Sequence, residues 1–383
     1  MLPKYLKGLE STKPMLSLRN RFWLSCLSVS IIFTATAAYA GMYGFDHFNP
    51  YTKKERILSL EDVPLSLPDY RAFMRDNLLM LIRYARQQNP DFKIIVHEGQ
   101  DLLNKSLWEY SREGYNRARI SPDADDKYFL FHNRYLDTEP ETNTDAYEYL
   151  HSIDAIAVNN IYCGVETINP IALKHRLVAI SIEQCANQEA LDNATVAAMV
   201  DKRSIYGFTD LSSAFKTIGN YNIINDSAKN IYTFSDAQNI LILNDDSNYK
   251  NQQDLVDDLA KTNYDIIIIK PLFDYTQRFS VDNLRKLRFK KNGSKRLLIA
   301  EFNVSEAHPR EYYWLDNWHI GSPDWLKRKS FSSRDGIIVK YWQNEWKKVI
   351  SRYFKDLLNE GFDGVFFTGV ENYRYYERQN PLE

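Results

Sequence analysis

The sequence has little glycine, proline or cysteine and no marked excess of charge of either sign. Its 383 residues include 14 Gly, 13 Pro and 3 Cys, while 44% are hydrophobic and 26% are charged. These values exclude a disordered, collagen-like or coiled-coil chain. The 48 Lys and Arg residues nearly balance the 50 Asp and Glu residues, so the charge gives no reason to expect nucleic acid as a partner.

Motifs for nucleotides and metals are also missing. Neither a G-x-G-x-x-G motif nor a P-loop follows any predicted strand, which counts against a nucleotide-binding sheet. No C-x-x-C motif or His/Cys cluster occurs, so nothing supports a metal held by cysteine. The run Asn244-Asp245-Asp246 lacks the glycine and the distal glutamate of a calcium loop. The sequence therefore predicts no cofactor and no metal.

The first 40 residues have the pattern of a secretory signal peptide. Arg19 and Arg21 precede an apolar stretch at 22–38, and Ala38-Tyr39-Ala40 has the form of an A-x-A cleavage site. The alternative is an uncleaved membrane anchor, because 17 residues is close to the shortest span of a bilayer. The interpretation as a signal peptide predicts a secreted or periplasmic protein with no stable membrane insertion after cleavage.

Two cysteines remain after signal cleavage. Cys26 lies within the predicted signal peptide, whereas Cys163 and Cys185 follow adjacent predicted strands. An even pair in an oxidising compartment can form a disulfide, and the alternative is two buried thiols.

Eight short apolar runs alternate with helix-like segments. The runs occupy residues 93–96, 153–158, 177–182, 204–208, 240–243, 265–270, 296–302 and 364–367. Uninterrupted apolar runs of this length are typical of parallel strands that are buried on both faces. The sequence therefore predicts an α/β protein with a (β/α)8 TIM barrel, in preference to an open doubly wound sheet.

Polar residues follow most of these predicted strands. In a TIM barrel the chemistry lies at the carboxyl ends of the strands, so residues just past each run are candidates for the site. They are Glu98, Asn159, Glu183, Asp210, Asn244, Asp245, Lys270, Glu301 and Thr368.

Aromatic residues are abundant and concentrate in one segment. The chain has 26 Tyr, 20 Phe and 7 Trp, and rings with a polar edge are common in clefts that bind sugars or peptides. Seven of these rings are Tyr312, Tyr313, Trp314, Trp318, Trp325, Tyr341 and Trp342. We expect about a third of them to contact a ligand and the others to pack in the core or in loops.

Five segments in the carboxyl-terminal part follow one another in a characteristic order. They read YDIIII, RLLIAEFNVSEA, REYYW, VKYW and GFDGVFF, at residues 264–269, 296–307, 310–314, 339–342 and 361–367. In order and spacing they resemble glycoside hydrolase family 114, the endo-α-1,4-polygalactosaminidases and their TIM-barrel relatives. The resemblance implies a TIM barrel that hydrolyses an amino-sugar polysaccharide.

The amino-terminal half resembles a later part of the same family. Residues 81–103 resemble the segment after the GFDG strand in that family, and residues 153–156 resemble its next strand. The resemblance thus implies a circular permutation of one barrel domain, in which residues 41–232 form the later half-barrel and residues 235–383 the earlier half-barrel. The alternative is two half-barrel-like domains.

The usual catalytic carboxylates of this family are replaced. The resemblance places an Asp after the GFDG strand and a Glu at the end of the IDG strand, and here these positions are Thr368 and Asn159, or Asn160. Glycoside hydrolysis generally needs two carboxyl groups that flank the bond. Neither a threonine nor an asparagine can take such a role at the level of a carboxylate.

Other carboxylates reach the predicted mouth of the barrel. Glu301, Glu98 and Glu183 are the predicted catalytic residues, with Glu301 and Glu98 as a relocated pair. Carboxyl groups buried close together have pKa values that are pushed apart, which sets acid and base roles. The alternative is a polar mouth in which each carboxylate pairs with Lys270, Arg176 or a neighbouring amide.

Further residues are predicted to bind the substrate. Glu306 matches a glutamate in the S-E-A turn of the family, where it can hold loop amides or a sugar hydroxyl. His97 is either a proton carrier or a hydrogen-bonded neighbour of Glu98. The predicted substrate-binding residues are Asn159, Lys270, Glu306, Tyr312, Trp314, Tyr341, Trp342 and Thr368.

Two functions remain open at this point. The first is an exported glycoside hydrolase of the endo-α-1,4-polygalactosaminidase type, which predicts two carboxyl groups about 5 to 9.5 Å apart in a grooved mouth. The second is a catalytically inactive barrel that binds polysaccharide or a partner in the envelope or biofilm. This second function predicts an aromatic groove with isolated or salt-bridged acids. The sequence leaves the oligomeric state undetermined.

Overall fold

The computed structural model describes most of the chain after residue 67. The described residues are 58–59, 68–104, 128–129, 139–164, 166–201, 204–208, 215–218, 223–331, 333 and 335–379. All of them belong to one compact unit, Tyr51–Glu383. The predicted signal peptide at 1–40 and the candidate Asp210 lie outside the described residues.

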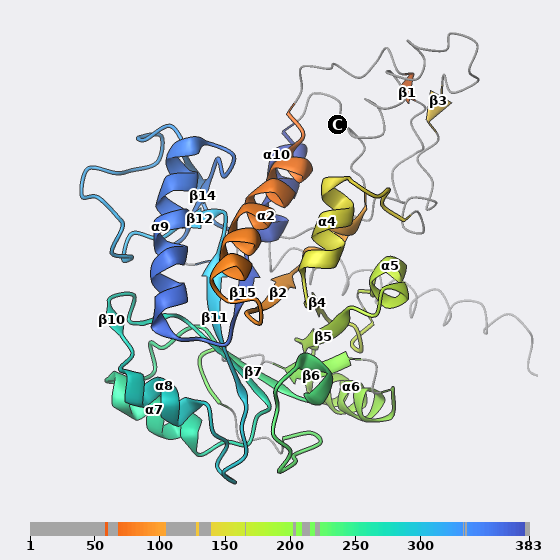
Figure 1. The fold of residues 1–383 in the computed structure, drawn as a ribbon, viewed down its shortest axis with the longest axis vertical. Helices are drawn as coiled ribbons and strands as arrows, with labels where there is room; N and C mark the ends of the chain where they lie inside the picture. The colour runs from red at the N-terminus through yellow and green to blue at the C-terminus, as the bar shows by residue number, and fades with distance from the viewer. Residues whose placement is uncertain are drawn as a thin grey trace, which may run out of the picture. The chain divides into compact units, whose positions relative to one another are not determined.

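Eight parallel strands form the centre of this unit (Figure 1). They are β2 (Lys93–His97), β4 (Ala155–Asn159), β5 (Val178–Glu183), β6 (Ser204–Phe208), β7 (Ile240–Leu243), β8 (Ile266–Ile269), β11 (Leu297–Asn303) and β15 (Gly364–Thr368). Each corresponds to one of the eight predicted runs. Their order in the sheet is β6-β5-β4-β2-β15-β11-β8-β7, and a parallel bridge between Tyr206 and Asn239 joins the two ends. The protein is therefore a (β/α)8 TIM barrel, as predicted.

Helices surround the strands. They are α2 (Tyr70–Gln88), α4 (Asp145–Ser152), α5 (Pro170–Lys174), α6 (Gln188–Asp201), α7 (Gln252–Ala260), α8 (Val281–Leu287), α9 (Asn344–Glu360) and α10 (Tyr373–Glu377), with the 3₁₀ turns η2 (Gln100–Leu103), η4 (Phe234–Asp236) and η5 (Val370–Asn372). Helix α9 buries Trp346, Ile350 and Leu357, which recur at helical spacing and so form one face. It ends at Gly361, whose positive φ of 96° suits a residue without a side chain.

Shorter strands extend the barrel at its edges. β12 (Glu306–Ala307), β13 (Leu326–Lys329) and β14 (Ile337–Val339) form an antiparallel sheet in the order β12-β14-β13. β9 (Leu272–Phe273) and β10 (Gln277–Arg278) form a hairpin, and β1 (Leu58–Ser59) pairs with β3 (Tyr128–Phe129). Among the described residues, no helix is both long enough and apolar enough to cross a membrane.

The interior of the barrel is filled by alternate residues of its strands. One cluster of buried side chains includes Ile95, Ile182, Ile268, Ile299 and Phe366, which come from five different strands. A second, larger cluster lies between the strands and the helices and includes the buried faces of α2 and α9. Because side chains alternate along a strand, the inner cluster establishes which residues of each strand face the barrel axis.

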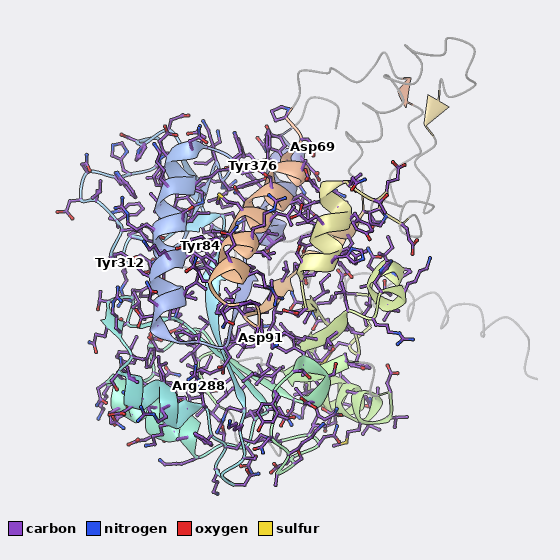
Figure 2. The ribbon with its side chains drawn as sticks, viewed as in Figure 1. Asp69, Tyr84, Asp91, Arg288, Tyr312 and Tyr376 are labelled. Carbon is purple, nitrogen blue, oxygen red and sulfur yellow. A yellow bond between two sulfur atoms is a disulfide. The ribbon has the colours of Figure 1, made fainter. Side chains whose placement is uncertain are left out.

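The first described helix of the barrel packs against helices from the end of the chain. Helix α2 precedes β2 in sequence, yet it lies between α9 and α4 in the helical layer (Figure 1), and β2 pairs in parallel with β15. Figure 2 shows Asp69 and Tyr376 at one end of α2 and Asp91 at the other. At the Asp69 end, Arg71 forms two hydrogen bonds of 3.1 Å with Glu377 of α10. The two ends of the barrel sequence are thus joined by direct contacts.

Aspartates at the amino ends of three strands bind the backbone of a neighbouring segment. Asp154 accepts a hydrogen bond from Ile94 N (2.7 Å) and Asp363 from Leu298 N (2.9 Å). Asp265 does the same for Gln238 N (2.8 Å). Each of these aspartates therefore holds the start of a neighbouring segment in place.

Replacing Asp154 by alanine is expected to destabilise the barrel by about 1 to 3 kcal/mol, because Ile94 N would lose its partner at a buried position. Arg86 would also lose its ion pair with Asp154 (2.7 Å). Urea unfolding of Asp154→Ala checks this, with Asp91→Ala as the control. Asp91 is exposed in the turn before the same strand, so its replacement should change the free energy of unfolding by less than about 0.5 kcal/mol. Equal effects of the two changes would contradict the assigned role of Asp154.

Candidate active site

Polar side chains form a ring at the carboxyl ends of the barrel strands. Ile95, Ile299 and Phe366 belong to the inner cluster, so the residues two positions further along, His97, Glu301 and Thr368, face the same side. The same alternation applies to the other strands. We call the resulting set the mouth ring, and its members are His97, Asn159, Asn244, Lys270, Glu301 and Thr368.

Glu301 is the acidic member of the mouth ring. Its Oε1 accepts a hydrogen bond from Thr368 Oγ1 (3.1 Å) and another from Asn244 Nδ2 (3.3 Å). Burial raises the pKa of Glu301 above its usual value, while Lys270, Asn244 and Thr368 act in the opposite direction. Strands β7, β11 and β15 therefore hold one carboxyl group in a defined orientation inside the mouth.

Lys270 lies at the end of β8 and contacts an aromatic ring that the sequence reasoning missed. Its Nζ lies 3.8 Å from the centre of the Tyr275 ring. The rings of His308 and Tyr275 also stack, with their centres 4.1 Å apart. Tyr275 and Asp274 have positive φ angles of 64° and 49° in the β9–β10 hairpin. Two such residues in succession are unusual, and strained backbone of this kind concentrates at functional sites.

Glu98 lies immediately after β2, with a positive φ of 54°. Its Oε1 accepts a hydrogen bond from the backbone N of Asn159 (3.1 Å) and lies 3.9 Å from His97 Nε2. His97 Nε2 and Asn159 Oδ1 are 3.0 Å apart and form a hydrogen bond. His97 is thus hydrogen-bonded to Asn159 and not to Glu98, and Glu98 connects the ends of β2 and β4.

Glu183 does not reach the mouth, contrary to the prediction. Ile182 faces the barrel axis, so Glu183 points to the outer side of β5, where it is fully buried. Its carboxylate accepts hydrogen bonds from Tyr162 N (3.0 Å), Cys163 N (3.0 Å) and the hydroxyl of Ser181. These contacts anchor the loop after β4 and occupy both oxygens, so Glu183 is a structural residue.

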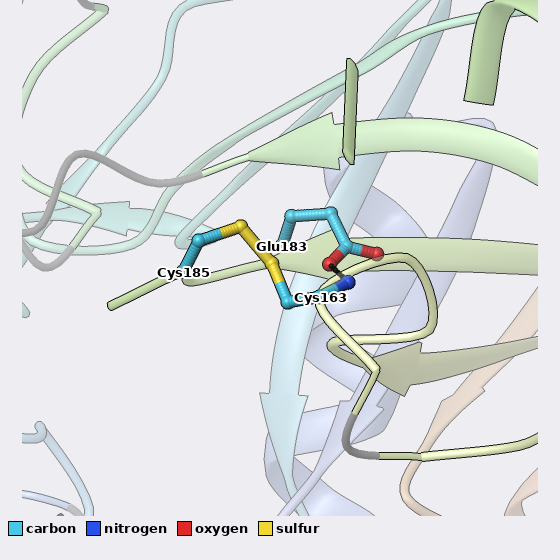
Figure 3. Close-up of side chains that lie close together, drawn as sticks. All are labelled: Cys163, Glu183 and Cys185. Atoms are coloured by element: carbon cyan, nitrogen blue, oxygen red, sulfur yellow. Dashed lines mark hydrogen bonds between the residues drawn. A yellow bond between two sulfur atoms is a disulfide. The ribbon is translucent and has the colours of Figure 1, made fainter. Parts of the chain in front are cut away.

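Cys163 and Cys185 form a disulfide next to this carboxylate (Figure 3). Their Cα atoms are 5.7 Å apart, within the range that a disulfide allows, so the disulfide is the one of the two alternatives that the structure shows. Together with Glu183 they form a group of three potential metal ligands. Because the two sulfurs are bonded to each other, this group has no thiolate to offer a metal.

Glu306 lies under the loops that flank the mouth. It is 6% exposed, and its carboxylate accepts hydrogen bonds from Ser330 Oγ (2.5 Å), Asn372 Nδ2 (3.2 Å) and Asn303 Nδ2 (3.4 Å). The first of the two roles considered for Glu306, holding loops together, accounts for these contacts. A direct contact with substrate would require this cluster to open.

The predicted aromatic residues lie in the helical layer and not in the mouth ring. Tyr341 is fully buried and donates a hydrogen bond to Tyr70 O (2.6 Å), so its prediction as a substrate-binding residue is wrong. Trp342 packs against Tyr70 and Tyr376, where α2 meets α10. Both rings therefore stabilise the join between the two ends of the barrel sequence.

The other two predicted rings lie on the segment between β12 and β13. Tyr312 is 44% exposed beside α9 (Figure 2), and its hydroxyl donates to Asp356 Oδ2 (2.6 Å). Trp314 contacts Trp318, which contacts the buried Trp325. These three rings pack against the larger buried cluster between the strands and the helices. Tyr275, beside Lys270, is the aromatic residue that the structure places at the mouth.

Two further glutamates with unusual surroundings were not predicted. Glu371 follows β15 by three residues, and Glu311 lies among aromatic rings next to α9. Each has one buried carboxylate oxygen, Oε2, with no hydrogen-bond partner in the part of the chain that the structure describes. Burial raises the pKa of Glu371, and it raises the pKa of Glu311 to about 7. No signal in the sequence separates them from ordinary surface glutamates.

The stability of the protein is expected to depend on pH through Glu311. Its pKa is higher in the folded protein than in the unfolded chain, so the folded state binds the extra proton between about pH 4.5 and pH 7 and loses stability as pH rises through this window. Glu311→Gln keeps an acceptor for Tyr353 OH (3.1 Å) and removes the charge. We expect it to stabilise the protein by about 2 to 3 kcal/mol at pH 8 and by little at pH 4.5.

Denaturant unfolding at the two pH values checks the effect of Glu311. The control is Glu345→Gln, which removes the same charge at an exposed position on α9. A gain in stability at pH 8 that is equal for both variants, or absent from Glu311→Gln, would contradict the prediction.

Comparison with known proteins gives relatives without a described activity. No protein-family model matches the chain. Uncharacterized protein MJ1477 of Methanocaldococcus jannaschii is 29% identical over 178 residues, which is 44% of this chain and 49% of that protein. Uncharacterized proteins of Thermotoga maritima and Deinococcus radiodurans are 27% and 26% identical over 84 residues, or 22% of this chain and 26% and 27% of those proteins. The chain thus spans about half the length of the first relative that it matches and about a quarter of the others.

Proposed function

We propose that this protein is an exported glycoside hydrolase that cleaves an amino-sugar polysaccharide of the α-1,4-galactosamine type, with Glu301 as a catalytic carboxyl group. The observation that carries this proposal is the position of Glu301. It faces the barrel axis at the end of β11 and is held by Thr368 and Asn244. A carboxyl group fixed in this way in a barrel mouth is suited to be one of the two that hydrolysis of a glycosidic bond generally needs.

The contacts of Glu301 support a relocated carboxylate. Thr368 stands where the resemblance places a catalytic Asp, and its hydroxyl donates to Glu301 Oε1 (3.1 Å). Glu301 lies on β11, the strand next to β15. Compared with the family pattern, the carboxylate is thus on the neighbouring strand, but its oxygen contacts the side chain at the position where the catalytic Asp is expected. Asn159, which stands where the resemblance places the catalytic Glu, also contacts a carboxylate from a neighbouring strand. Its backbone N donates to Glu98, which follows the neighbouring β2 (3.1 Å).

The charge of the mouth supports an amino sugar as substrate. Three carboxyl groups, those of Glu98, Glu301 and Glu371, influence one another or His97 electrostatically, and Lys270 is the cation of the mouth ring. Carboxyl groups at the mouth can attract the free amino groups of a polymer. The pattern at residues 1–40 supports export, where such polymers occur.

The test is release of reducing ends from a partly deacetylated α-1,4-galactosamine polymer by the purified protein, residues 41–383. Release that rises linearly with enzyme concentration and with time would support the proposal. Neutral and N-acetylated polymers of the same linkage serve as controls for the charge argument, and we expect slower release from both. No release from any of the three polymers would overturn the proposal.

A binding protein is the second candidate. It is favoured by the hydrogen bonds of Glu98, whose Oε1 is already occupied by a backbone N–H, and by the replacement of both expected catalytic residues. Retained binding of the polymer without release of reducing ends, measured by calorimetry on the same preparation, would identify this function.

A further inference from the structure

The hairpin that carries Tyr275 is anchored at two points. The backbone N of Asp274 donates to Oδ2 of Asp246 (2.6 Å), a side chain after β7 that is 8% exposed. The carboxylate of Asp274 forms an ion pair with Arg310 on the segment between β12 and β13. These contacts hold Asp274 and Tyr275 in their left-handed backbone conformations, which residues with a side chain rarely adopt without such support.

The ring of Tyr275 contacts three side chains. The His308 ring stacks on it, with the two planes 10° apart, and Arg310 Cζ lies 4.7 Å from its centre. His308 is held in turn, because its backbone N donates to the hydroxyl of Tyr313 (3.1 Å). The third contact is Lys270 Nζ, which lies 3.8 Å from the centre of the ring. The ring therefore gives the Lys270 ammonium group a fixed surface, where the cation is attracted to the π electrons.

The Lys270 ammonium group lies at the mouth and carries a positive charge. Ile266 and Ile268 belong to the inner cluster, so Lys270, directly after β8, faces the barrel axis. Lysine is protonated at neutral pH. Glu301 and Asp246 attract this charge, but no carboxylate that the structure describes forms an ion pair with it. Lys270 thus presents a positive charge and hydrogen-bond donors to a ligand in the mouth.

We propose that Tyr275 is a positioning residue that holds the Lys270 ammonium group in the mouth, and that Lys270 selects an N-acetylated sugar at the position it contacts. This inference rests on the proposed function. A free amino sugar is positively charged and would be repelled by Lys270, whereas an acetyl carbonyl oxygen accepts a hydrogen bond from it. Glu301 and Glu98 can attract the free amino groups of other sugars in the polymer. A polymer with both kinds of sugar is therefore the preferred substrate, and a fully deacetylated polymer is a poorer one.

The test compares two α-1,4-galactosamine oligomers of equal length, one fully deacetylated and one N-acetylated at alternate sugars. The measured quantity is the ratio of kcat/KM for the alternating oligomer to kcat/KM for the deacetylated oligomer. We expect a ratio of about tenfold or more for the wild-type protein, because two like charges in contact weaken binding. Lys270→Met is expected to lower the ratio below about threefold, and Lys270→Arg, which keeps the charge, is expected to keep it above this value.

Two variants of Tyr275 test the positioning role. Tyr275→Phe keeps the ring and is expected to keep most of the ratio, whereas Tyr275→Leu removes the ring and is expected to lower the ratio as Lys270→Met does. A merely structural contribution of Tyr275 would change stability and both rates together and leave the ratio unchanged. Lys291→Met is the control for the loss of a lysine, because Lys291 is exposed and does not belong to the mouth ring. We expect its ratio to stay within about twofold of the wild-type value.

The outcomes separate this inference from the proposed function. Wild-type protein that cleaves the deacetylated oligomer at least as fast as the alternating one, or Lys270→Met that keeps the wild-type ratio, would overturn selection by Lys270 while the proposed function stands. Equal ratios in Tyr275→Phe and Tyr275→Leu would overturn the role of the ring. Wild-type protein that cleaves neither oligomer would overturn both proposals. Thermal unfolding shows whether each variant is folded, and Lys270→Gln supplies a second neutral variant if Lys270→Met does not fold.

Discussion

Glu301→Gln is expected to lower kcat for polymer hydrolysis by about 10³-fold or more, with little change in thermal stability. The amide oxygen of glutamine can still accept from Thr368 Oγ1 and Asn244 Nδ2, so the geometry of the mouth is retained. The negative charge is lost, and with it the ability to take a proton from water. The change thus separates the chemistry of this side chain from its packing.

The measurement is the steady-state rate of reducing-end release together with the Kd for a non-cleaved oligomer. Asp316→Asn is the control, because Asp316 is exposed on the segment between β12 and β13 and its replacement also removes one carboxylate. We expect the control to keep its rate within about twofold and Glu301→Gln to keep its affinity within about tenfold. A Glu301→Gln variant with more than a tenth of the wild-type rate would exclude Glu301 from the chemistry.

The barrel could be predicted from the sequence because its strands are short, apolar and separated by polar segments. The run Ile266–Ile269 and its equivalents have no polar residue to face water, so they fit strands covered on both faces. Because these strands have no polar residues, the sequence does not show which of their residues face the barrel axis. An all-apolar strand carries no alternation, and for this reason Glu183 and Glu301, each at a strand end, looked alike in the sequence although they point to opposite sides.

The aromatic residues show a second limit of sequence reasoning. Tyr341 and Trp342 have the composition of a sugar-binding surface, but rings with a polar edge also suit a buried position where the hydroxyl finds a partner. Tyr341 OH meets Tyr70 O, a residue 271 positions away in sequence. Tyr275 was missed because its place beside Lys270 depends on the backbone of the β9–β10 hairpin.

The circular permutation, like the family, stays a prediction, because any (β/α)8 chain that begins with a helix and ends near a strand has this order of elements. Helix α2 precedes β2 at the start of the described barrel, and the last strand, β15, pairs in parallel with β2. A barrel cut between a strand and the helix that follows it has this order. The ion pair of Arg71 with Glu377 (3.1 Å) then joins the two sides of the cut.

Lys290→Met is expected to destabilise the protein by about 3 to 5 kcal/mol. Lys290 and Asp265 are both fully buried, and Lys290 Nζ lies 2.5 Å from Asp265 Oδ1. The ammonium group also donates to the backbone oxygens of Ser227 and Lys229, both at 3.0 Å. Removing it leaves a buried carboxylate and two backbone carbonyl groups without their donor, which costs more than the lost attraction alone.

A double-mutant cycle tests whether the cost comes from the stranded carboxylate. Lys290→Met combined with Asp265→Asn should recover about half of the lost free energy, because the neutral amide needs no cation and Gln238 N can still donate to its oxygen. Lys291→Met is the control, since the neighbouring lysine side chain is exposed, and we expect a change below about 0.5 kcal/mol. If the double variant were as unstable as the sum of the two single variants, the buried charge would not be the cause. The two backbone carbonyls would then account for the loss, and Lys290 would act mainly as a clamp on residues 227–229 at the amino-terminal end of the barrel.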